Sequence, residues 1–308
     1  MGIAKDLIKI FFYQKRLNKS LFCKKTLLIS QNAVYANEKE IFKIFKKNKL
    51  IIPKIPKNFD KENKIFLWKG TDKENNPNAN YLMKLLGTSN SFCCDISSYE
   101  NPDFILDLNK PVKKSLYNRF NNILDTGTFE HIFNIPQALD NYSKMLKKNG
   151  YLIISTTCSN LIDHGFYSFS PTFFFDYFEK NGFKINNCFL KEYSPFLFEL
   201  KSNIYKYEER GSEIPFISNK AVEVIVFAQK VNSYKKQKFP TQYVYKNMEN
   251  WGKKKYKTID VNKNNSSKKY IKIKIKDIIY KLLKYLPFSF EVAFYSLLRG
   301  KKINRIRL

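Results

Sequence analysis

Three aspartates, each at the end of a short apolar run, are the residues whose types and spacing best suit a ligand site. The runs end at Asp95, Asp107 and Asp125 in a chain of 308 residues. Continuous apolar runs without polar alternation are typical of strands buried on both faces, as in a parallel sheet covered by helices. Ligands of such sheets bind beyond the carboxyl ends of the strands. We therefore expect the three carboxylates to gather around one ligand.

Two histidines lie close to this region. His131 follows the third run, and His164 follows a fourth apolar run at 151–155. Because an imidazole titrates near neutral pH, each is a candidate general base. Glu130 precedes His131 in the same turn, and Tyr167 is a candidate for orienting an acceptor. The sequence shows no tight cluster of acids and histidines, so we expect no metal site. The five cysteines form no Cys-x-x-Cys pair, which favours reduced thiols over structural zinc.

Strands and helices alternate along the part of the chain that must position these side chains. Apolar runs predict strands at 26–30, 92–95, 104–107, 122–125 and 151–155, and a final antiparallel pair at 183–189 and 222–229. Helical periodicity with start and stop signals predicts helices at 37–47, 78–86, 136–147 and 172–180. This alternation predicts an α/β fold.

The order and spacing of five motifs resemble a branch of the class I S-adenosylmethionine (SAM)-dependent methyltransferases. The motifs are Asp-Ile-Ser-Ser-Tyr-Glu (95–100), Asp-Leu-Asn-Lys-Pro (107–111), Asp-Thr-Gly-Thr-Phe-Glu-His-Ile-Phe-Asn (125–134), His-Gly-Phe-Tyr-Ser-Phe-Ser-Pro (164–171) and Asn-Gly-Phe (181–183). The resemblance implies a Rossmann-like methyltransferase fold, a mostly parallel seven-stranded sheet with helices on both faces. It also implies S-adenosyl-L-methionine as the cofactor.

The resemblance assigns a role to each aspartate. Asp95, with Ile96, would accept hydrogen bonds from the ribose hydroxyls, and the alternative for Asp95 is a helix N-cap. Asp107, with the backbone of Leu108, would meet the adenine amino group, and the alternative is a turn before the Asn-Lys-Pro segment. The residues expected beside the sulfonium are Asp125, Thr126 and Gly127. His131 and His164 would face the transferred methyl group, and the alternative for His131 is a wall of the cofactor site.

The glycine-rich turn that usually follows the first strand of this family is absent. Two segments are candidates for its place: Ser30 and Gln31 after the strand at 26–30, and the segment 65–70. We prefer the first, because it better matches the branch that the motifs resemble. A long segment at 191–219 is predicted to be an irregular loop covering the acceptor site.

Composition and charge divide the chain into four parts. They are a basic segment (1–25) predicted as a weakly amphipathic helix at the domain edge, a methyltransferase-like domain (26–230), a linker (231–267), and a basic amphipathic helical tail (268–308). Residues 231–308 hold 21 Lys and Arg against 4 acidic residues, or +17 of the net +28, which leaves +11 for the rest. We expect 277–307 to contact an anionic membrane surface, and expect no specific nucleic-acid partner.

The activity expected from the resemblance is methyl transfer to a hydroxyl of a sugar or surface-glycan precursor, by a cytoplasmic protein with a peripheral place on the inner face of the membrane. One alternative is a methyltransferase-like scaffold without activity in a glycan-assembly complex, which the missing glycine-rich turn favours. The other is an RNA methyltransferase, which the net charge favours. Against RNA, the basic surplus lies outside the predicted catalytic domain.

Overall fold

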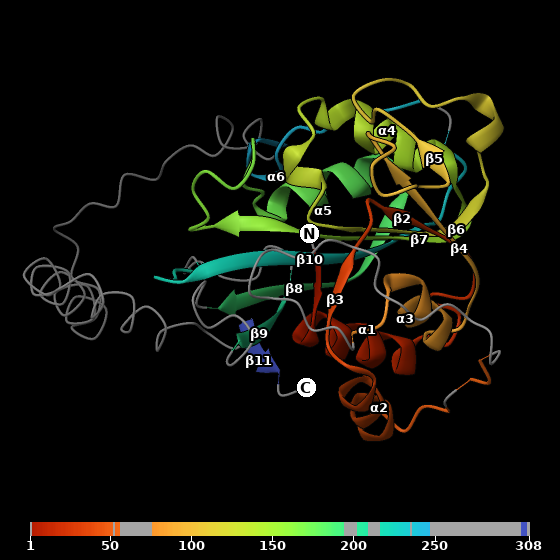
Figure 1. The fold of residues 1–308 in the computed structure, drawn as a ribbon. Coiled ribbons are helices and arrows are strands. Elements are labelled where there is room, and N and C mark those ends of the chain that lie inside the picture. The colour runs from red at the N-terminus through yellow and green to blue at the C-terminus, as the bar shows by residue number, and fades with distance from the viewer. Residues whose placement is uncertain are drawn as a thin grey trace, which may run out of the picture. The chain divides into compact units, whose positions relative to one another are not determined.

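The protein is built on one main sheet, and the predicted site lies beyond the carboxyl ends of its parallel strands. The computed structural model describes residues 2–51, 53–55, 76–193, 202–208, 216–234, 236–246 and 303–306. The main sheet has the strand order β11-β9-β8-β10-β7-β6-β2-β4-β5 (Figure 1). Its strands are β2 (Lys24–Ile29), β4 (Thr88–Asp95), β5 (Phe104–Ile105), β6 (Phe120–Thr126), β7 (Leu146–Ser159), β8 (Phe183–Tyr193), β9 (Ser202–Tyr207), β10 (Ala221–Lys230) and β11 (Ile303–Ile306).

The central strands are parallel, and the direction changes at β10. β2 pairs in parallel with both β4 and β6, and β4–β5 and β6–β7 are also parallel. β10 lies antiparallel between β7 and β8. From β5 to β8 the sheet is therefore the mostly parallel seven-stranded sheet of a Rossmann-like methyltransferase fold, which confirms the predicted fold class. β9, paired antiparallel with β8, and β11 extend it beyond seven strands.

Helices cover both faces of the sheet, as predicted. α1 (Lys5–Leu17), α2 (Glu38–Lys47) and α3 (Ala79–Leu85) lie on one side, and α4 (Ile135–Met145) and α5 (Pro171–Lys180) lie on the other (Figure 1). Local signals explain where they begin: Asn37 and Glu40 form a capping box at α2, and proline stands in the first turn of α4 and α5. The four predicted helices are present, each within two residues of its expected ends.

The basic N-terminal segment is part of the core, which corrects its placement at the domain edge. β1 (Gly2–Ala4) pairs in parallel with β3 (Ala33–Tyr35) in a separate two-stranded sheet, and α1 follows directly. Ile8, Phe11 and Phe12 on α1 have no exposed surface and belong to the main apolar cluster. Phe12 packs on Phe45 of α2 with ring centroids 4.3 Å apart. The helix therefore fills the face of the sheet that α2 and α3 leave uncovered.

The segment predicted as an irregular loop at 191–219 is partly regular. β8 continues to Tyr193, and β9 returns beside it as an antiparallel strand. β9 is only six residues long and begins with Ser and Asn, which favour turns over strands, so the sequence pattern did not reveal this hairpin. Residues 194–201 and 209–215 lie outside the described residues, as do the alternative first strand at 65–70 and most of the tail.

The chain divides into two compact units. The first comprises 1–209, 220–240 and 304–308, and the second comprises 210–219 and 241–303. Within the described part of the second unit, α6 (Tyr243–Lys246) is a single helical turn. In the described ranges, no helix combines the length and the apolar character that crossing a membrane requires.

Candidate functional site

Two neighbouring cavities lie beyond the carboxyl ends of the parallel strands. The smaller, about 180 Å³, is lined by residues that follow β2, β4 and β5, and the larger, about 440 Å³, by residues that follow β6 and β7. His131 lines both cavities. β2 lies between β4 and β6, so the chain order reverses there, and such switch points are where open α/β sheets bind ligands.

The smaller cavity contains the carboxylate of Asp95 at the end of β4. Asp95 accepts a hydrogen bond from the Ser30 hydroxyl (2.9 Å) and another from the Ser97 backbone N–H (3.1 Å). The cavity walls are mainly apolar: Ile29, Cys94, Ile96, Leu106, Leu108 and Ile132, with Ser30, Asn109 and Thr128 as polar members. Ser30, Asp95, Ile96 and Leu108 are thus placed together as the sequence predicted.

Ser30 adopts the backbone conformation that a glycine usually supplies. Its φ is +63°, in the left-handed region that residues other than Gly and Asn rarely adopt. Its N–H donates to the Cys94 carbonyl (2.8 Å), which ties the turn after β2 to the end of β4. The central position of β2 and this turn identify 26–32, rather than 65–70, as the counterpart of the missing glycine-rich turn.

Three predicted cofactor contacts line neither cavity, and the first two are Asp107 and Gln31. Asp107 accepts hydrogen bonds from the backbone N–H and the side-chain amide of Asn109 (both 3.0 Å), which lower the pKa of its carboxyl. The carboxylate therefore closes the turn that the sequence gave as its alternative role, and Leu108 lines the cavity instead. Gln31 lines neither cavity, whereas its neighbour Asn32 is buried and donates to the Ser30 carbonyl (2.9 Å).

Asp125 is fully buried and organises the turn after β6. Its carboxylate accepts from the Tyr142 hydroxyl (2.7 Å) and from the N–H groups of Thr128 (2.9 Å) and Phe129 (3.2 Å). Burial raises the pKa of Asp125 to about 7, against these hydrogen bonds. Asp125 lines neither cavity, so the three aspartates do not surround one ligand as predicted. The following residues, Thr126 and Gly127, do line the larger cavity.

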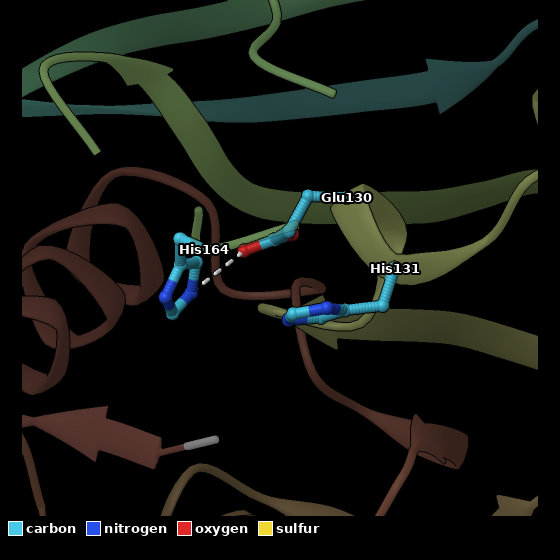
Figure 2. Close-up of side chains that lie close together, drawn as sticks. All are labelled: Glu130, His131 and His164. Atoms are coloured by element: carbon cyan, nitrogen blue, oxygen red, sulfur yellow. Dashed lines mark ion pairs between the residues drawn. The ribbon is translucent and has the colours of Figure 1, made fainter. Parts of the chain in front are cut away.

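Glu130, His131 and His164 converge at the larger cavity (Figure 2). One ligand-type atom from each side chain lies within 4.8 Å of the others. His164 Nε2 is 3.6 Å from Glu130 Oε1, and the two imidazole rings have centroids 5.3 Å apart. The expectation that acids and histidines form no tight cluster was therefore wrong, because the fold brings together residues that are 34 positions apart.

The loop that carries His164 is fixed against Glu130. The Phe166 N–H donates to the Glu130 carbonyl (2.8 Å), and a Cβ at Gly165 would lie 2.8 Å from that same oxygen. Glycine is therefore required for this close approach. The Glu130 side chain is 2% exposed, and its Oε2 accepts from the Thr156 hydroxyl on β7 (2.7 Å).

The surroundings shift the pKa values of two members of this cluster. Burial raises the pKa of the Glu130 carboxyl above its ordinary value, with the hydrogen bond from Thr156 opposing this. Burial, and then the nearby His164, lower the pKa of His131. His131 is therefore neutral at pH 7 and keeps a lone pair that can accept a proton or bind a cation.

The larger cavity is also lined by residues that the sequence did not single out as site residues. Among them are Lys191 and Tyr193 on β8 and Glu223 on β10. Lys191 is buried, pairs with Glu223 (3.2 Å) and lies over the Tyr193 ring (4.5 Å from the centroid). The available signal was Glu223, the one acidic residue in the apolar run of β10.

Tyr167 lies elsewhere. It lines a third cavity, of about 390 Å³, with Leu139, Phe169 and Phe173, and its hydroxyl donates to the Phe133 carbonyl (2.9 Å). The structure therefore separates Tyr167 from the other three predicted catalytic residues.

No protein-family model matches the sequence, and no curated protein is similar to it at a significant level. Among solved structures, a SAM-dependent methyltransferase from Archaeoglobus fulgidus is 11% identical with a TM-score of 0.34, and covers 74% of this chain and 95% of its own. A SAM-dependent methyltransferase from Thermotoga maritima is 15% identical with a TM-score of 0.33, and covers 73% and 92%. Likeness at this level carries no argument about function, which has to come from the site itself.

Proposed function

We propose that this protein is a SAM-dependent methyltransferase that methylates a hydroxyl of a sugar or surface-glycan precursor. The observation that supports it is the pair of cavities at the switch point of the sheet, which share His131 as a common wall. A donor in one cavity and an acceptor in the other would meet at that side chain. Such a juxtaposition is what a transfer between two bound molecules requires.

The residues of the smaller cavity fit the nucleoside part of the cofactor. Asp95 presents a carboxylate at the end of the second strand of the parallel set, where vicinal hydroxyls can donate two hydrogen bonds to it. Ile96, Leu106 and Leu108 provide apolar surface for a flat base. Thr126, the last residue of β6, and Gly127 line the larger cavity. With the nucleoside bound beside Asp95, the methionine end would extend toward the larger cavity.

Methyl transfer to a hydroxyl asks two things of the chain. The bound cofactor supplies a methyl group on a sulfonium, which a nucleophile displaces in line. The protein has to position the acceptor oxygen about 3 Å from that methyl and to weaken its O–H bond. The side chains placed to take the proton, or to lower the pKa of the hydroxyl, are Glu130, His131 and His164.

The walls of the larger cavity suit a sugar. Tyr35 and Tyr193 are aromatic residues of the wall, and the ion pair of Lys191 with Glu223 offers donors and acceptors. Sugar rings have apolar C–H faces and polar edges, so they are bound by this combination of aromatic and charged groups. Lys191 is buried and Glu223 is half-buried, so a hydroxyl that reaches the pair exchanges hydrogen bonds with groups that are largely shielded from water.

Calorimetry with SAM and with S-adenosylhomocysteine tests the cofactor assignment. We expect binding by the full chain and at least a tenfold loss for Asp95→Ala. The matched control is Glu208→Ala, which removes an exposed carboxylate just after β9 that lines neither cavity. No heat of binding at millimolar ligand would refute the proposal and favour the inactive scaffold. Equal affinities for Asp95→Ala and the control would refute the site.

The acceptor is tested by transfer of an isotope-labelled methyl group. Full-length protein is incubated with labelled SAM and, in separate reactions, with nucleotide-activated sugars, glycan oligomers and unmodified RNA. We expect label on a sugar oxygen, located by NMR as a methyl ether. Label on RNA, or on nitrogen of any acceptor, would contradict the proposed acceptor while leaving the cofactor assignment intact.

A further inference from the structure

We propose that Glu130, His131 and His164 bind a divalent transition-metal ion of the zinc type within the larger cavity. Binding of the ion follows from these residues alone. Only its part in activating the acceptor rests on the proposed function.

The distances between the donor atoms support a metal ion rather than a direct hydrogen bond. His164 Nε2 and Glu130 Oε1 are 3.6 Å apart, beyond the range of about 2.7–3.2 Å in which an N–H donates to an oxygen. Two ligands at about 2.0–2.1 Å from one tetrahedral ion are separated by roughly 3.4 Å. The third donor atom, on His131, completes a group within 4.8 Å. Small rotations of two exposed imidazoles are enough to bring all three donors to bonding distance.

The chemistry of the donor set selects the kind of ion. Two imidazoles and one carboxylate are a ligand set of catalytic zinc sites and of open iron(II) sites, in which further positions are left for water or substrate. Mg²⁺ and Ca²⁺ prefer oxygen ligands and are disfavoured by two nitrogens. The open positions here would face the larger cavity, which all three residues line. A hydroxyl of the acceptor can therefore become a further ligand.

The carboxylate is held as a metal-bound carboxylate usually is. Its second oxygen is fixed by the Thr156 hydroxyl, which leaves Oε1 directed at the histidines (Figure 2). Hydrogen bonds that orient a ligand from behind are a regular feature of metal sites. Gly165 and the Phe166 N–H hold the His164 loop against the Glu130 backbone, so the two halves of the site approach in a fixed way.

The charge balance of the cavity also favours a cation between these residues. Glu130 is buried, and the nearby Lys191 is paired with Glu223 rather than with Glu130. A buried carboxylate is costly without a compensating positive charge. A divalent ion would supply that charge and would lower the pKa of a hydroxyl bound to it, whose proton then leaves to solvent.

The chain offers a sharp test because His131 and His164 are its only two histidines. Tag-free full-length protein is treated with a chelator, dialysed, and titrated with Zn²⁺ by calorimetry and with Co²⁺ by visible absorption. We expect one ion per chain, and Co²⁺ should shift the proton NMR signals of both imidazoles. Glu130→Gln, His131→Asn and His164→Asn should each weaken Zn²⁺ binding at least tenfold. Mg²⁺ should not compete at equal concentration.

Two controls separate this site from others. Cys23→Ser removes a partly exposed thiol outside the cavity, and Glu208→Ala removes an exposed carboxylate; both should bind Zn²⁺ like the wild type. Circular dichroism checks that each variant is folded. Because His164 is exposed, His164→Asn is the variant least expected to disturb folding. No saturable binding, or binding that His164→Asn leaves unchanged, would overturn the proposal. The titration needs no methyl donor, so its outcome is independent of whether SAM binds.

Discussion

Ser30 shows how a single residue can replace a sequence signature. The glycine-rich turn of the resembled family is missing, yet Ser30 takes a left-handed backbone conformation and gives its hydroxyl to Asp95. The hydrogen bond gives a physical reason for a serine at this strained position, because it directs the Asp95 carboxylate. A glycine would relieve the strain but would lose this contact.

Substitutions at Ser30 separate the two effects. Ser30→Ala keeps the strain and loses the hydrogen bond, so we expect it to lower the free energy of unfolding by about 1–2 kcal/mol. Ser30→Gly should recover about 1 kcal/mol of that loss, because glycine adopts a positive φ freely. Chemical denaturation measures both. At exposed Ser98, where φ is not positive, the order should reverse and alanine should be the more stable; the same order at both positions would contradict this account.

Asp125 should make the protein less stable as the pH rises. Its pKa in the folded state is about 7, above the ordinary value of about 3.9, so the folded state binds more protons than the unfolded state between these values. The contribution is therefore present below about pH 4 and is lost as the pH rises toward 7. Asp125→Asn keeps the oxygen that accepts from Thr128 and Phe129 and cannot titrate. Between pH 5 and 8, the free energy of unfolding of Asp125→Asn should rise relative to that of the wild type by up to a few kcal/mol, as measured by chemical denaturation. Parallel pH profiles of the two proteins would show that Asp125 is ionised throughout.

At the scale of elements, the buried parallel strands and their helices could be predicted, because each leaves its own periodic pattern. The strands ending at Asp95 and Asp125 and the helices α2 and α4 were found in this way. The site was only half predictable. The cavity beside Asp95 could be predicted from the ends of the strands alone. The pairing of Glu130 with His164 could not, because it depends on how the loop after β7 folds back, and no local sequence pattern indicates that.

Gly165 lets the loop after β7 pack closely against the backbone of Glu130. In Gly165→Ala the added Cβ meets the Glu130 backbone carbonyl at 2.8 Å, so the loop has to move away. We expect a loss of about 1–3 kcal/mol in stability and at least a tenfold loss of Zn²⁺ affinity, because His164 moves with the loop. Thermal unfolding and metal titration measure the two. Ile162→Ala, at a 90% exposed position in the same loop, is the control and should change neither; wild-type affinity in Gly165→Ala would mean that the loop does not set the site.

At the scale of the whole molecule, charge and composition were a poor guide to the extent of the core. The N-terminal segment has a basic composition, yet α1 supplies some of the most deeply buried side chains. The apolar residues between Leu7 and Phe12 are buried while the lysines of the helix stay half-buried, so the basic composition concealed its role. The second surplus of positive charge, at 231–308, falls mostly outside the described residues, and its role as a membrane contact is a proposal from sequence.

The tail should bind anionic membranes through its charge and apolar residues together. Flotation of the full chain with vesicles should show binding when they contain phosphatidylserine and little binding when they are neutral, and added salt should weaken it. Each Lys or Arg near the surface contributes about 1 kcal/mol, so replacing five of them by glutamine should lower the partition coefficient at least tenfold. The five are Lys281, Lys284, Arg299, Lys301 and Lys302. A matched control removes the same charge from exposed lysines of the first unit: Lys43, Lys46, Lys47, Lys147 and Lys148. An equal loss in both variants would show that net charge alone attracts the protein, and would remove the tail as a specific membrane contact.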